Sequence, residues 1–119
     1  MGLLSRFVKR DRRQYPRLPA RFDVMYGRGE ELTLTTCVDI SQGGLSFLSK
    51  SPIPEGTELD MRLMIAPDNQ EDMIELKSKV VRNEGKRTAV AFEDVRRSDL
   101  QRLLDFMARL PSAAQAAEA

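Results

Sequence analysis

The feature that most constrains the fold is an alternation of apolar and polar residues with a period of two, which begins at Phe22 and continues to Phe92. Successive side chains of a β-strand point to opposite faces of a sheet, so this period is typical of strands with one buried face. Turns rich in Gly, Pro and Asn divide the pattern into short segments. Six strands are therefore predicted, over residues 22–26, 33–40, 45–47, 58–65, 74–80 and 88–92.

Six short strands with such turns predict a mainly β chain that closes into a small antiparallel barrel. Closure removes the exposed edges that an open sheet would leave. The apolar residues of each segment are expected to face inward. In the second segment this rule places Leu34, Thr36, Val38 and Ile40 inside, and Thr33, Thr35, Cys37 and Asp39 outside.

A different spacing follows the last predicted strand. Its apolar residues recur at the period of an amphipathic helix, and they are Leu100, Leu103, Leu104, Met107 and Leu110. Ser98 and Gln101 fit a capping box at the start of this helix, and Pro111 is expected to end it. The apolar stripe is expected to close one mouth of the barrel or to pack on its flank, with dimerisation or partner binding as the alternative.

The chain is expected to form one domain with appended ends, since 119 residues suffice for one core. The predicted parts are a flexible basic N-terminal arm over residues 1–20, the barrel over 21–95, the helix over 96–111 and a disordered tail over 112–119. Residues 1–21 carry seven basic side chains and one acidic, whereas the remainder carries twelve basic and seventeen acidic. A basic arm on an acidic body indicates an anionic partner, or an arm that docks on its own body.

Several classes of function are disfavoured by composition. The chain has no histidine, which is the commonest general base, and Cys37 is its single cysteine, so neither a thiolate metal site nor an internal disulfide is expected. No group of residues predicts an enzyme or a cofactor. The lone cysteine, the lack of a signal peptide and the lack of an apolar run of about 20 residues predict a cytoplasmic protein with no membrane span.

The basic segment carries two arginines, Arg13 and Arg17, four residues apart. Pro16 opposes a continuing helix, so the segment is expected to be a stiff, extended loop. The planar fork of arginine can bind a phosphate or a guanine edge with two hydrogen bonds, and its flat face can stack on a base.

A second candidate motif lies in the turn between the second and third strands. Asp39 can accept hydrogen bonds from a guanine edge, and Ser41 offers a hydroxyl group. Gly43 and Gly44 permit close approach of a ligand to bare backbone N–H groups. The alternative is an ordinary hairpin turn in which Asp39 and Ser41 cap backbone groups.

The two motifs together resemble the PilZ domain, the bacterial receptor module for cyclic di-GMP. The motif residues that carry the resemblance are Arg13, Arg17, Asp39, Ser41 and Gly44. It extends over residues 12–110 and includes the segments 38–45, 54–56, 80–82 and 89–93 and the final helix. The chain departs from the family at Ala89, where glycine is frequent, and Arg12 adds a cation directly before the first motif.

The resemblance implies a receptor that does no chemistry on its ligand. Arg12, Arg13 and Arg17 would contact phosphates and guanines, while the second motif would hold a guanine edge from the barrel through Asp39, Ser41, Gly43 and Gly44. Ligand binding would order the arm and present a surface to an effector protein that controls motility, biofilm formation or secretion. The resemblance does not determine whether each chain binds one ligand or two. It also does not determine whether the protein is a monomer or a homodimer.

Two other classes of binding protein compete with this interpretation. One is a PilZ-like adaptor that binds a protein but no nucleotide. The other is a small barrel that binds RNA or single-stranded DNA, which the acidic body and the few aromatic residues disfavour. No DNA or RNA partner is therefore expected.

Overall fold

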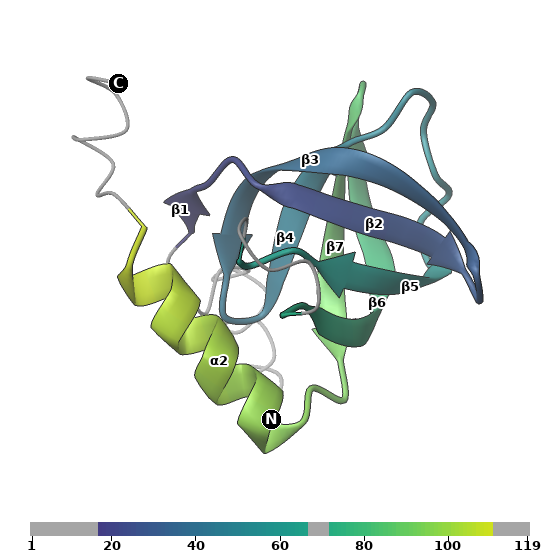
Figure 1. Cartoon of the computed structure of the whole chain (residues 1–119). Coiled ribbons are helices and arrows are strands. Elements are labelled where there is room, and N and C mark those ends of the chain that lie inside the picture. The colour runs from purple at the N-terminus through teal and green to yellow at the C-terminus, as the bar shows by residue number, and fades with distance from the viewer. Residues whose placement is uncertain (1–16, 67–71, 111–119) are drawn as a thin grey trace, which may run out of the picture.

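A computed structural model of the chain describes residues 17–66 and 72–110. The strands and the helix of this part follow one another in the order drawn in Figure 1. Their bounds are β1 Leu18–Pro19, β2 Asp23–Arg28, β3 Glu31–Ser41, β4 Gly44–Leu48, β5 Glu58–Leu63, β6 Ile74–Glu84, β7 Arg87–Glu93 and α2 Arg97–Ala108.

The sheet closes on itself, as the sequence predicted. The strands lie in the order β1-β3-β2-β5-β6-β7-β4, and β4 pairs with β3, so that β2 to β7 form a closed, antiparallel barrel of six strands. The short strand β1 pairs with β3 through Leu18 and Pro19, which lie opposite Ile40 and Asp39, on the same edge of β3 that pairs with β2 further along. These two residues were expected in the arm and instead form part of the sheet.

The inward faces of five predicted strands are confirmed. Their apolar residues alternate with polar ones and fill one buried core. The members of the core from these predicted strands are Val24, Leu45, Phe47, Leu59, Met61, Leu63, Ile65, Ile74, Leu76, Val80 and Val90.

The predicted facing of β3 is wrong over its first half. A β-bulge interrupts the strand, because Cys37 pairs with Phe47 while Asp39 pairs with Ser46, which leaves Val38 as an extra residue. An extra residue inverts the alternation, since side chains alternate strictly along a strand.

Residues before the bulge therefore point the opposite way from the simple pattern. Thr35 pairs with Val24, whose side chain is in the core, so Leu34 lies on the outside with 61% of its surface exposed. Cys37 is fully buried rather than exposed. After the bulge the prediction holds, with Ile40 in the core and Asp39 on the outer face.

The predicted capping box of the helix is also wrong. The N-cap residue is Arg96, which has extended backbone and makes no side-chain capping bond. Its carbonyl accepts the first helical bond from the N–H of Leu100, at 2.8 Å. Ser98 therefore lies within the first turn, and Gln101 donates instead to Asp105 one turn later, at 3.0 Å.

The helix α2 packs against one end of the barrel, where β1 also lies (Figure 1). Leu103 and Phe106 are buried, and the ring of Phe106 meets the ring of Phe22 edge-on at 4.9 Å. Arg102 donates to the carbonyl of Met73 at 3.1 Å and pairs with Asp72, which fastens the helix to the start of β6. No helix in residues 17–66 and 72–110 is long and apolar enough to cross a membrane.

The burial of Cys37 predicts an unreactive thiol. Desolvation, with a smaller contribution from the charge of Asp39, raises the pKa of this thiol far above its ordinary value. We expect iodoacetamide to leave the folded protein unmodified at mildly alkaline pH and to alkylate it after unfolding in urea, as measured by mass spectrometry. Rapid alkylation of the folded protein would contradict the buried placement.

Candidate ligand-binding site

The two sequence motifs meet at the side chain of Arg17. Its Nη1 donates to Oδ1 of Asp39 at 2.9 Å and to Oγ of Ser46 at 3.0 Å. The side chains of Arg17 and Asp39 are only 18% and 19% exposed. The backbone explains this contact, because β1 directly follows Arg17 and pairs with β3 at Asp39, while Ser46 lies opposite Asp39 on β4.

The contacts that Arg17 makes within residues 17–66 and 72–110 use only one nitrogen of its guanidinium. A guanidinium carries five N–H donors, and both hydrogens on Nη1 are used by Asp39 and Ser46. Within the described part of the chain, the donors on Nε and Nη2 have no hydrogen-bond partner. The carboxylate holds the fork in place, so Arg17 is a positioned cation that could still bind an anion.

The hydroxyl of Ser41 is occupied by its own turn. Its Oγ donates to the carbonyl of Gly44 at 3.3 Å and accepts from the N–H of Gly43 at 3.2 Å, and the residue is buried. The expectation that the N–H of Gly43 is bare is therefore wrong. Ser41 therefore caps backbone groups of its own turn, as the alternative interpretation expected. Asp39 does not, because its side chain points outward to Arg17.

Gly44 has a steric role in the barrel. It begins β4 and pairs with Ala91 of β7 on one side and with Ser41 on the other. A Cβ added to Gly44 would lie 2.1 Å from the carbonyl oxygen of Val90, which is far inside van der Waals contact. Only glycine lets β4 and β7 approach this closely.

One residue of this cluster was not predicted from the sequence, and two predicted site residues lie outside the part of the chain that the structure describes. Ser46 was not singled out, although a polar residue between the inward Leu45 and Phe47 must point to the same outer face as Asp39. Arg12 and Arg13 lie outside the described residues.

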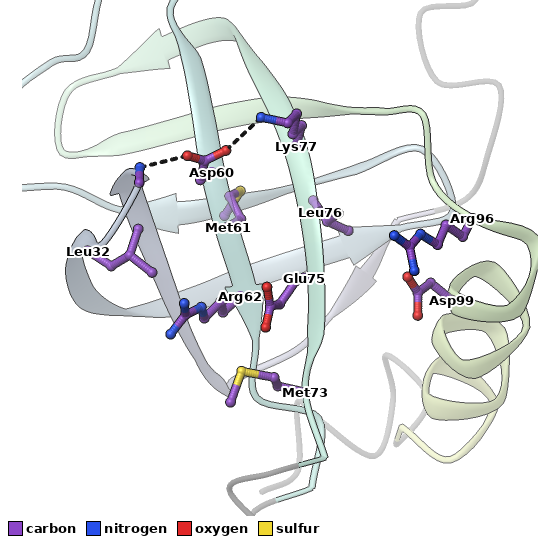
Figure 2. Close-up of a pocket in the computed structure, with 11 residues that line it drawn as sticks. Leu32, Asp60, Met61, Arg62, Met73, Glu75, Leu76, Lys77, Arg96 and Asp99 are labelled. Atoms are coloured by element: carbon purple, nitrogen blue, oxygen red, sulfur yellow. Dashed lines mark hydrogen bonds and ion pairs between the residues drawn. The ribbon is translucent and has the colours of Figure 1, made fainter.

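A hollow lies elsewhere on the barrel, between β5, β6 and the start of α2 (Figure 2). It has a volume of about 600 Å³ and contains none of the predicted site residues. Its carboxylate Asp60 accepts from the N–H of Gly29 at 2.7 Å and from Lys77 at 3.2 Å, as Figure 2 shows, and these bonds lower the pKa of Asp60. The polar groups at this end of the hollow are thus satisfied by one another.

The described residues hold no group of three or more His, Cys, Asp or Glu that could bind a metal ion. The cluster at Arg17 consists of a positioned cation, an adjacent carboxylate and the buried hydroxyl of Ser46. Such a set suits a ligand with both anionic groups and hydrogen-bond donors.

Comparisons with known proteins show the family and the fold that the chain shares. A family model described as "PilZ domain" matches residues 11–109. The inhibitor of motility of Bacillus subtilis (MotI/DgrA) is 25% identical with a TM-score of 0.68, over 82% of this chain and 50% of that protein. The present chain thus spans about half the length of that relative.

Two more distant structures share the fold. The PilZ domain of YcgR from Escherichia coli, solved with c-di-GMP, is 14% identical with a TM-score of 0.65, over 90% of this chain and 93% of that domain. The PilZ domain of CeSA from a cellulose-synthesizing bacterium is 16% identical with a TM-score of 0.62, over 79% and 99%. No curated protein sequence matches the chain significantly.

Proposed function

The chain belongs to the PilZ domain family, and we propose that it is a non-enzymatic, cytoplasmic receptor for cyclic di-GMP. The observation that carries the proposal is the contact of Arg17 with Asp39, which joins two motifs 22 residues apart on one outer face of the barrel. This face presents a cation for phosphate beside an acceptor for a guanine edge.

The proposed binding mode follows from the available atoms. The Nε and Nη2 donors of Arg17 would bind a phosphate, or O6 and N7 of a guanine, which is the pairing by which arginine reads guanine in DNA. The second carboxylate oxygen of Asp39 would accept from the guanine N1–H and amine. Arg12 and Arg13 would add phosphate contacts from the first motif, while Ser41, Gly43 and Gly44 shape the turn beneath the ligand.

The receptor would signal through a change of surface. A ligand held by both motifs would order the arm and bring residues 1–10 onto the barrel, provided that it binds this closed state more tightly. An effector protein would then read the new surface. The likeness to an inhibitor of motility supports motility as one output, with biofilm formation or secretion as the other outputs of this proposal.

The first experiment is an isothermal titration of the protein with cyclic di-GMP, with cyclic di-AMP as the matched control. We expect saturable heat with cyclic di-GMP only, because the adenine edge offers Asp39 an acceptor where guanine offers N1–H. The titration also gives the number of ligands for each chain. Equal binding of both dinucleotides would contradict the guanine contact.

An adaptor that binds no nucleotide is the second candidate. It is favoured by the observation that Asp39 and Ser41 already have partners within the chain. Absence of heat, together with an unchanged melting temperature at high cyclic di-GMP, would select the adaptor and end the receptor proposal.

A further inference from the structure

The strand β3 has a free edge over its first half. Its pairing with β4 ends where Cys37 lies opposite Phe47, whereas its pairing with β2 continues to Glu31. The hairpin of β2 and β3 therefore extends past the end of β4, at the end of the barrel that lies away from α2 (Figure 1). Within the described part of the chain, no strand pairs with residues 31–36 on the side that faces away from β2, which we call the free edge.

The hydrogen bonds of β2 identify the backbone groups that the free edge presents. The carbonyl of Phe22 accepts from β3 at 2.9 Å, and the carbonyl of Asp23 accepts from the residue after β5 at 3.0 Å. Backbone groups alternate sides along a strand, so every second residue of β3, with Thr33 among them, bonds to β2. The N–H and C=O groups of Leu32 and Leu34 then point away from β2, where residues 17–66 and 72–110 offer them no hydrogen-bond partner.

Side chains on both faces of the sheet are exposed along this edge. Neighbouring side chains of a strand point to opposite faces, and Thr33 and Leu34 are both exposed, Leu34 with 61% of its surface. At the end of the free edge Leu48 of β4 is 43% exposed, and its carbonyl accepts from the hydroxyl of Thr35 at 2.5 Å. The unpaired backbone groups of Leu32 and Leu34 thus lie beside exposed apolar side chains.

The sequence of the free edge lacks the usual protection against pairing. Natural edge strands often carry lysine, proline or a bulge that hinders the addition of a second strand. Residues 32–36 are Leu-Thr-Leu-Thr-Thr, with no charge and no proline, and the bulge of β3 lies beyond them at Val38. The free edge is therefore suited to receive another β-strand.

The free edge is complementary to a second copy of itself. Two antiparallel copies can meet with Thr33 opposite the partner's Thr33, which places Leu32 of each copy opposite the partner's Leu34. Four backbone hydrogen bonds can then form, and the leucines pair across the two strands on the outer face. Glu31 comes to lie opposite the partner's Thr35, so the like charges of the two copies stay apart.

We infer that the free edge of β3 pairs with the same edge of a second copy of this chain, so that residues 32–34 of both copies form a continuous antiparallel sheet around a two-fold axis. The paired surface is small, so the dimer should form reversibly at high protein concentration rather than permanently. The free edge contains no residue of the candidate ligand-binding site, so the inference does not depend on nucleotide binding.

The first test is a disulfide between two copies of Thr33→Cys. The Cα atoms of a non-hydrogen-bonded pair lie about 4.5 Å apart, which is within the range of a disulfide. Mild oxidation with oxidised glutathione should give a covalent dimer on a non-reducing gel, while the buried Cys37 does not react. Glu31→Cys is the matched control, because its two copies would be about 13 Å apart in this register and should stay unlinked.

The second test is analytical ultracentrifugation of the full chain. The sedimentation coefficient of the parent should rise with protein concentration. Leu34→Lys should raise the dissociation constant of the dimer at least tenfold, because it sets an ammonium group against the partner's Leu32. Val81→Lys is the matched control, since Val81 is also apolar and is 47% exposed but lies on β6. It should dimerise like the parent protein.

Each test has a result that would overturn the inference. One is a Glu31→Cys variant that forms the disulfide as fast as Thr33→Cys, and another is an equal effect of Leu34→Lys and Val81→Lys on the dimer. A parent that stays monomeric up to about 1 mM would also overturn it, and would leave the free edge to a strand of a different protein.

Discussion

Replacing Gly44 by alanine is expected to cost the barrel about 3–5 kcal/mol of unfolding free energy, or to prevent folding altogether, which is the range of severe steric changes. The added Cβ would lie 2.1 Å from the carbonyl oxygen of Val90. That oxygen belongs to backbone, so β4 and β7 would have to separate where the ring is held closed. Urea unfolding followed by circular dichroism measures the loss.

Gly29→Ala is the matched control for this variant. Gly29 has a left-handed backbone, with φ of 59°, but a Cβ there would meet no atom within 4 Å. We expect a loss of about 1–2 kcal/mol, which is the cost of that conformation for a residue with a side chain. Equal losses in the two variants would show that the contact between β4 and β7 relaxes easily, contrary to the packing argument.

Replacing Arg17 by alanine is expected to weaken cyclic di-GMP binding more than a hundredfold. The variant loses every donor that the barrel side of the first motif supplies, and two charge-assisted hydrogen bonds together account for a factor of this size. Arg17→Lys should recover little, because an ammonium group cannot contact Asp39, Ser46 and a ligand as a planar fork does. Titration calorimetry measures both variants.

Arg21→Ala provides the matched control for Arg17. Arg21 belongs to the same basic segment but is exposed and lies four residues further along the chain. Its variant should bind cyclic di-GMP like the parent protein, and melting temperatures should show that all three variants are folded. If Arg17→Ala bound as tightly as Arg21→Ala, the pairing of Arg17 with Asp39 would be structural only.

The barrel could be predicted from sequence because its signals are local. Alternation within each segment and the turns between segments identify the strands without any knowledge of their partners. The facing of β3 could not be predicted in this way. Leu34 and Val38 both occupy apolar positions of the regular alternation, so the sequence predicts that both face inward. The bulge at Val38 depends on how β4 pairs with β3, and that pairing is not local.

The helix shows the same limit. Its apolar stripe predicted burial of Leu103, which is confirmed, but it omitted Phe106, which packs on Phe22. Spacing alone does not determine which side of a broad stripe meets the barrel. The capping box failed because Arg96, with extended backbone, begins the helix before Ser98.

The candidate site could be predicted from the sequence only for residues that belong to the two motifs. The placement of Arg17 and Asp39 on one face was expected, and the structure brings them together at 2.9 Å. Ser46 was not predicted as a member of the cluster, because its position opposite Asp39 depends on strand register.

The bulge in β3 also limits how this protein can change over generations. The strand is divided at Val38 into two halves that face opposite ways relative to a regular alternation. Loss of the Val38 codon would make the strand regular, with Cys37 still opposite Phe47 and Asp39 still opposite Ser46, so both halves would keep their faces. Loss or gain of one codon elsewhere in the strand would instead exchange the inner and outer faces of one half. Selection should therefore tolerate a deletion at Val38 better than a deletion at any position of β3 that lies away from the bulge.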